Sequence, residues 1–192
     1  MQSIRSLVFA AFLLTFSVVM HAQQPAPAAS TIDNEFVQKQ FGTNCTMLAI
    51  PPVATDLDGD GIDDAVIAAR CTSPMMDETE DSYRVMDPYN SFFGYGNPKV
   101  TTQFSTEDPE RRGISLLVIH GSGPDAWRSP TPKAKFMLVN LPFREFTVKR
   151  LSVKKKIVMA IYIAETGGDK MTSAVFWDGK KYKYMPLGSS ME

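Results

Sequence analysis

Five aspartates occur within nine residues of this chain, in the segment Asp56-Leu57-Asp58-Gly59-Asp60-Gly61-Ile62-Asp63-Asp64. Carboxylates spaced in this way can converge on one hard cation, because calcium prefers several oxygen ligands. Gly61 permits the sharp turn that would bring a later carboxylate and a backbone carbonyl onto the same ion. The pattern predicts a calcium site with five ligand residues: Asp56, Asp58, Asp60, Ile62 and Asp64.

An acidic turn without a bound ion is the alternative interpretation of this segment. Four converging carboxylates would repel one another, and a doubly charged cation relieves that repulsion while it closes the turn. Extracellular calcium modules often bind with dissociation constants of about 10⁻⁴ to 10⁻³ M, so such a site fills only in a calcium-rich compartment. We therefore expect Ca²⁺ as a structural cofactor, and no catalytic residue in this loop.

The spacing of the acids excludes an EF-hand, because the twelfth position counted from Asp56 is Ile67, where an EF-hand needs a bidentate glutamate. The D-x-D-x-D-G-x-x-D pattern, followed by a short apolar run, resembles the calcium-binding β-hairpin loop of FG-GAP and VCBS-type repeats, as in integrin α-subunits. The resemblance covers residues 53–70 and implies four side-chain ligands and the Ile62 carbonyl. The loop occurs once in the chain, so a propeller of calcium-bearing blades is not expected.

Two elements must position this loop, and the only cysteines bracket it. Segments 45–55 and 64–71 favour a strand, loop, strand arrangement, in which Pro51 and Pro52 mark a bulge or an edge. Such a hairpin would bring Cys45 and Cys71 together at its open end. An even pair in an exported chain favours a disulfide over two buried free thiols, and it would contribute about 3 kcal/mol of stability.

The N-terminal residues have the pattern of a secretory signal peptide at residues 1–22. Arg5 is followed by an apolar run from Leu7 to Met20, and Ala22 offers a cleavage point. A membrane anchor is the alternative, but the run is shorter than the ~20 residues of a spanning helix. We expect a disordered linker at 23–30, one domain at 31–192, and a secreted or periplasmic protein without a membrane span in the mature chain.

The remaining pattern predicts a mainly β (α+β) fold, with an antiparallel sheet, one short N-terminal helix and the calcium-loop hairpin. Ser30 or Thr31 can cap the helix, and Gly42 is placed to end it. Its apolar side should pack against the sheet through Ile32, Phe36, Val37 and Phe41. Strands are expected at 114–119, 135–141, 146–153, 157–163, 173–177 and 180–185, with a two-residue turn at Asp178-Gly179.

Two further surfaces have alternative interpretations. The irregular segment 72–112 contains aromatic residues that either cover one edge of the core or form a contact surface for a protein or glycan: Tyr83, Tyr89, Phe92, Phe93 and Tyr95. A local cluster of basic residues is either a solvated strand end or a contact for an anionic envelope polymer: Lys149, Arg150 and Lys154 to Lys156.

The net charge and the motifs of the chain exclude some classes of function. A formal net charge of −1 offers no electrostatic case for nucleic acid. The stretch Val118 to Gly123 resembles the oxyanion-loop segment of α/β-hydrolases, but the G-x-S-x-G elbow of that fold is absent. We therefore expect a non-catalytic binding or envelope-associated module, with a small extracytoplasmic, hydrolase-like enzyme using His120 as the alternative.

Overall fold

The computed structural model describes residues 31–72, 78–94, 112–141, 143–165 and 172–188. The predicted signal peptide and the linker lie outside these residues, as does Tyr95. The described chain is mainly β and forms two sheets, which confirms the expected fold class. None of its helices is long and apolar enough to cross a bilayer.

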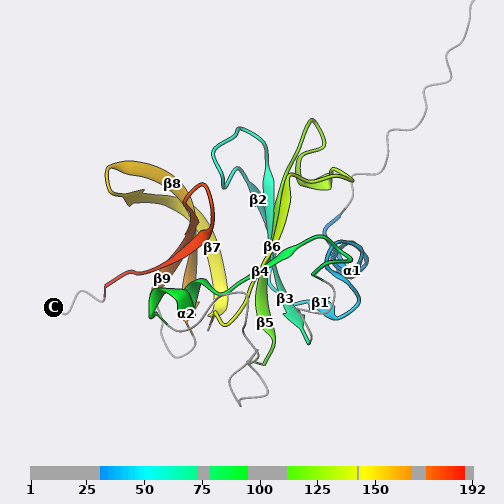
Figure 1. Cartoon of the computed structure of the whole chain (residues 1–192), viewed down its shortest axis with the longest axis horizontal. Helices are drawn as coiled ribbons and strands as arrows, with labels where there is room; N and C mark the ends of the chain where they lie inside the picture. Colours follow the sequence, from blue (N-terminus) through cyan, green and yellow to red (C-terminus); the bar gives the residue numbers. More distant parts are fainter. Residues whose placement is uncertain (1–30, 73–77, 95–111, 142, 166–171, 189–192) are drawn as a thin grey trace, which may run out of the picture.

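The larger sheet has six strands in the order β1-β3-β5-β6-β4, and β2 also pairs with β3 (Figure 1). All its pairs are antiparallel except β4 with β6, which run parallel. The sheet is therefore mainly antiparallel, as expected, with one parallel pair at its β4 edge. Its strands are β1 (Cys45–Met47), β2 (Val53–Thr55), β3 (Asp64–Cys71), β4 (Arg84–Met86), β5 (Ile114–His120) and β6 (Ala134–Leu138).

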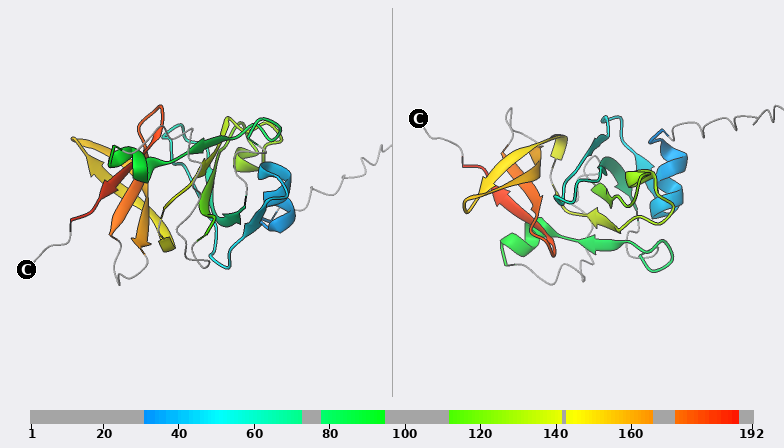
Figure 2. Two further views of the ribbon diagram at one scale, coloured as in Figure 1. Left: turned by 60° about the horizontal axis from the view of Figure 1, so that its bottom comes forward. Right: turned by 90° about the horizontal axis from the view of Figure 1, so that it is seen from above.

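The smaller sheet has four antiparallel strands in the order β10-β9-β8-β7. It is built from two consecutive hairpins, and the strands of the first are twice as long as those of the second. Figure 2 shows it beside the larger sheet, on the side away from the N-terminal helix. Its strands are β7 (Phe143–Val153), β8 (Lys156–Glu165), β9 (Ser173–Trp177) and β10 (Tyr182–Pro186).

The helix α1 (Asn34–Phe41) covers the outer face of the larger sheet. Gly42 ends it as predicted, with φ +88°, but the predicted caps Ser30 and Thr31 are wrong. Asp33 is the N-cap, because its carboxylate accepts the Phe36 N–H at 2.8 Å. The expected apolar side does pack on the sheet, so one helix layer and two sheet layers result.

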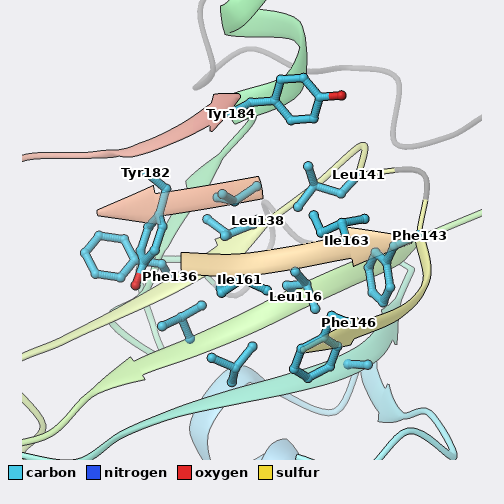
Figure 3. Close-up of a cluster of buried hydrophobic side chains, with 14 of the residues drawn as sticks. Leu116, Phe136, Leu138, Leu141, Phe143, Phe146, Ile161, Ile163, Tyr182 and Tyr184 are labelled. Atoms are coloured by element: carbon cyan, nitrogen blue, oxygen red, sulfur yellow. The ribbon is translucent and has the colours of Figure 1, made fainter. Parts of the chain in front are cut away.

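The apolar runs of β3 and β5 are explained by burial on both faces of the larger sheet. Alternate residues such as Val66 and Val118 face the smaller sheet, whereas Ile67 and Leu117 face α1. Figure 3 shows the first of these clusters filling the space between the two sheets, with Phe136 beside Tyr182 at one end. The ends of these strands are therefore held rigidly, and the acidic loop begins at one of them.

The acidic loop is held in a hairpin as predicted. Thr55 pairs with Asp64 at its closed end, and Cys45 pairs with Cys71 at its open end, where the two sulfurs form a disulfide. The incoming strand is interrupted between β1 and β2, where Pro51 and Pro52 lie on the sheet edge. Both expectations for this hairpin are confirmed.

The last hairpin forms where expected, but its turn is one residue later than predicted. The Asp178 N–H donates to the Lys181 carbonyl at 3.1 Å, so Gly179 and Lys180 are the central residues. The Asp178 side chain instead accepts the Lys180 and Lys181 N–H groups, both at 2.9 Å. Only Gly179 has a positive φ, of +97°.

Candidate metal centre

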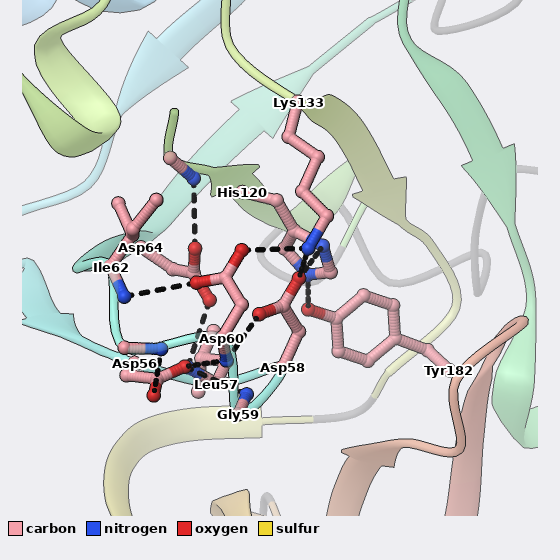
Figure 4. Close-up of polar contacts among 12 residues, drawn as sticks. Asp56, Leu57, Asp58, Gly59, Asp60, Ile62, Asp64, His120, Lys133 and Tyr182 are labelled. Carbon is pink, nitrogen blue, oxygen red and sulfur yellow. Dashed lines mark hydrogen bonds and ion pairs between the residues drawn. The ribbon is translucent and has the colours of Figure 1, made fainter. Parts of the chain in front are cut away.

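The first three aspartates of the loop are organised by its own backbone. The two carboxylate oxygens of Asp56 accept the N–H groups of Gly59 and Gly61, at 2.7 and 2.9 Å. Both glycines have φ above +80°, a conformation that other residues adopt only with strain. This wrapping turns the loop inward around its acidic side chains, as Figure 4 shows.

Among the described residues, the carboxylates of Asp56, Asp58 and Asp60 form one of two groups that could hold a metal ion. One oxygen from each lies within 4.8 Å of the others. This group contains three of the five predicted ligand residues, and the donor set consists only of oxygens, which suits a hard cation. Ile62 lies next to it, with its N–H donating to the Asp60 carboxylate at 2.9 Å.

Asp64 belongs to a second group, which shares Asp58 with the first. Its carboxylate is 1% exposed and accepts the N–H groups of Leu57 and Gly121, each at 2.8 Å. Burial raises the pKa of this carboxyl to about 6, against the lowering effect of these two bonds. The group that contains it is Asp58, Asp64 and His120, so Asp64 ties the loop to the end of β5. Its role as a fourth carboxylate ligand stays a prediction.

A lysine that the sequence did not indicate lies against the loop. The Lys133 ammonium contacts the Asp58 carboxylate at 2.6 Å and the Asp60 carboxylate at 2.7 Å. These contacts raise the pKa of Lys133 and lower that of Asp60. The Lys133 side chain is 49% exposed, so it can leave the loop without crossing the core. No spacing rule could find this residue, because more than 70 positions separate it from the loop.

His120 closes the buried side of the site. Its Nδ1 lies 3.3 Å from the Asp58 carboxylate, and its Nε2 lies 2.7 Å from the Tyr182 hydroxyl. Burial lowers the pKa of His120 to about 4, so the ring is neutral at pH 7. Because a carboxylate can only accept, Nδ1 carries the proton and Nε2 accepts from the tyrosine, whose pKa burial raises.

The same environment weakens the hydrolase alternative for His120. The side chain is 2% exposed, and both ring nitrogens are engaged. The Ser122 hydroxyl, in the stretch that resembles an oxyanion loop, donates to the Thr131 carbonyl at 2.6 Å. A base needs to reach a substrate proton, and this histidine faces the interior. The ring is better described as a support that orients Asp58.

The predicted aromatic contact segment divides between the core and the surface. Tyr83 is 2% exposed and packs on Phe41 in the cluster beneath α1. The helix α2 (Pro88–Phe92), which the sequence did not indicate, places Phe92 and Phe93 outside, each 50% exposed. Phe92 lines a pocket of about 160 Å³ together with Tyr184 and other residues of β10, and the rings of Tyr89 and Phe93 pack beside it.

Comparison of the chain with models of protein families, with curated proteins and with solved structures finds no match. The likeness of the acidic loop to calcium-binding hairpin loops therefore stays a resemblance of that one segment. Any functional assignment depends on the residues of this chain and their geometry.

Proposed function

We propose that this chain is an exported, calcium-binding, β-rich module in which a structural Ca²⁺ closes the loop from Asp56 to Asp64. The observation that carries the proposal is the convergence of the Asp56, Asp58 and Asp60 carboxylates within 4.8 Å of one another. In the proposed site, Asp64 and the Ile62 carbonyl complete the ligand set. Calcium accepts six to eight oxygens in irregular geometry, so one loop with added water can supply them.

The charge balance of the loop supports a doubly charged ligand. Four ligand aspartates bring four formal negative charges, His120 is neutral at pH 7, and Lys133 is the one cation in contact with them in the described chain. Three uncompensated charges remain in a partly desolvated loop, where the Asp58 side chain is only 3% exposed. A dication in place of the ammonium leaves two formal negative charges instead of three, so it compensates the loop better than Lys133 does.

Lys133 then acts as a competitor for the ion. Its ammonium lies against two of the proposed ligand carboxylates, so calcium binding requires the side chain to swing outward. The lysine stabilises the loop when calcium is scarce and gives way when calcium is abundant. This exchange fits the modest affinity of extracellular calcium modules.

The role of the module is proposed to be binding at the cell envelope or outside the cell. The Cys45 to Cys71 disulfide is typical of oxidising compartments, where calcium is also abundant. The exposed rings of Phe92 and Phe93 supply the proposed contact surface for a protein or glycan ligand. Calcium would stabilise the scaffold that presents this surface and would not touch the ligand.

Calcium-dependent thermal unfolding tests the proposal. Millimolar calcium should raise the melting temperature of the chain relative to the same protein in EDTA, and magnesium should do so less. The double variant Asp58→Ala, Asp60→Ala should lose this shift, whereas a surface control such as Asp125→Ala should keep it. A full calcium shift in the double variant would show that the ion binds elsewhere.

A further inference from the structure

The long hairpin of β7 and β8 extends beyond the rest of its sheet. β9 pairs with β8 only from Ala160 to Ile163, whereas β7 accompanies β8 as far as the pair Val153 and Lys156. The outer part of the hairpin, residues 150–159, is therefore a two-stranded ribbon. Figures 1 and 2 show its tip projecting from the end of the molecule opposite α1.

One side of this ribbon anchors it to the sheet. Leu151 is 8% exposed and packs with Val158 and Phe176 in a small apolar cluster. Because side chains alternate, Ile157 and its cross-strand partner Ser152 lie on the opposite side. Ile157 is 72% exposed, the highest exposure among the large apolar side chains of the described chain.

The tip is strongly basic although the whole chain is slightly acidic. It carries five cations at exposed positions: Lys149, Arg150, Lys154, Lys155 and Lys156. No acidic residue occurs between Phe146 and Ala164 in the sequence. In the described part of the chain no carboxylate forms an ion pair with these cations, in contrast to Lys133 and Lys183.

The two turn residues of this hairpin are lysines in a backbone conformation that lysine rarely adopts. Lys154 and Lys155 both have positive φ, of +45° and +70°. Hairpin turns of this kind favour Asn-Gly, because most side chains are strained there. Two lysines at strained positions, next to a third, place three ammonium groups at the extreme end of the ribbon.

We propose that this hairpin tip docks the protein onto an anionic lipid bilayer. The lysines would contact the phosphate-bearing headgroups, and Ile157 would enter the boundary between headgroups and acyl chains. Each Lys or Arg close to an anionic surface strengthens binding roughly fivefold, so five of them suffice for a peripheral, reversible attachment. The exposed aliphatic residue favours a bilayer over a purely ionic polymer.

The composition of residues 149–157 argues against a nucleic acid as the occupant. This stretch contains no aromatic side chain on which bases could stack, and stacking is a principal source of affinity for single strands. The proposal does not rest on the calcium site, since the tip shares no residue with it. The docking proposal adds a location, the membrane surface, to the proposed binding role.

Vesicle flotation of the full chain in EDTA tests the docking proposal, because EDTA removes any bridging of lipids by calcium. Vesicles of phosphatidylcholine with about 30% phosphatidylglycerol should capture the protein, and vesicles of phosphatidylcholine alone should not. Binding should fall as salt is raised. Lys154→Gln, Lys155→Gln, Lys156→Gln should weaken binding at least roughly tenfold.

Two further variants keep the test specific. Lys39→Gln, Lys180→Gln, Lys181→Gln removes the same charge at exposed positions away from the tip and should bind nearly as well as the unmodified chain. Ile157→Ser should weaken vesicle binding roughly threefold to tenfold without lowering the melting temperature. Equal loss in both lysine variants would overturn the proposal. The proposal would also be overturned if the protein bound soluble dextran sulfate more tightly than vesicles and Ile157→Ser did not weaken that binding.

Discussion

Replacement of Lys133 by methionine separates the two roles assigned to its ammonium group. Methionine keeps most of the apolar stem and removes the charge that contacts Asp58 and Asp60. Without calcium, the loop should lose a stabilising cation. With calcium, the same change should remove a competitor.

The size of the effect follows from exposure. Exposed ion pairs contribute about 0.2 to 1 kcal/mol each, and Lys133 and Asp60 are exposed enough for this range to hold. The Asp58 side chain is 3% exposed, so the loss of its partner leaves a largely buried charge and costs more. We expect a loss of about 2 kcal/mol in EDTA, or about 4 to 8 °C in melting temperature.

The gain in calcium affinity should match that loss. Calcium has to displace the ammonium in the unmodified chain, so the free energy that Lys133 contributes is subtracted from the binding of the ion. Removal of about 2 kcal/mol of competition corresponds to roughly thirtyfold tighter binding. Isothermal titration with calcium measures the affinity, and chemical denaturation in EDTA measures the stability.

Lys183 provides the matched control for this variant. Its side chain is 48% exposed and forms an ion pair at 2.8 Å with Asp178, within the last hairpin of the smaller sheet. Lys183→Met should cost less than about 1 kcal/mol and leave calcium affinity unchanged. A Lys133→Met variant that loses stability in EDTA but binds calcium with unaltered affinity would refute the competition, because the ion and the ammonium would then not share a position.

Three other predictions concern the scaffold of the site. Burial lowers the pKa of His120, so this residue contributes its full stability to the fold above pH 6.5 and loses that contribution as pH falls toward 4. Burial raises the pKa of Asp64, so this residue contributes its full stability below pH 3.8 and loses that contribution as pH rises through 6. The two effects oppose each other, so denaturation in EDTA should show nearly constant stability between about pH 4 and pH 6. In His120→Gln only the Asp64 effect remains, so this variant should become more stable on acidification over that range, by roughly 3 kcal/mol. Gly121→Ala should cost about 2 to 4 kcal/mol, because its Cβ would lie 2.7 Å from a backbone carbon, whereas Gly188→Ala, with open space around it, should be nearly neutral by thermal unfolding. Replacing both cysteines by alanine should cost about 3 kcal/mol in denaturant titration, and an unchanged midpoint would show that the bridge does not restrict the unfolded chain.

Much of the fold could be predicted because it is written in local patterns. The apolar run of β5 and the bracketing cysteines specify buried strands and a hairpin by periodicity and symmetry alone. The cap of α1 was misplaced because Thr31 and Asp33 are both good caps, and only the position of the helix on the sheet decides between them. The turn after Trp177 lies one residue later than predicted because the Asp178 carboxylate accepts the backbone N–H groups of Lys180 and Lys181. Asp178 therefore precedes the two central residues of the turn and needs no positive φ.

The parts of the site that escaped prediction are contacts between distant segments. The three clustered aspartates lie in one loop, so their convergence follows from spacing and glycine. Lys133 and Tyr182 reach the same place only because β6 and β10 both begin there, which no local pattern encodes. Asp64 lies in a different group from Asp56 and Asp60 for the same reason, because its carboxylate accepts the N–H of Gly121, which follows β5.

A crystal structure grown in saturating calcium tests the proposed metal centre most directly. We expect a calcium ion bound by oxygens of Asp56, Asp58 and Asp60 at about 2.3 to 2.6 Å, with the Lys133 side chain turned out to solvent. Anomalous scattering would identify the ion. A Lys133 ammonium that still contacts Asp58 and Asp60, with no ion beside these carboxylates, would contradict the proposed calcium site and leave the loop as an acidic turn bridged by lysine.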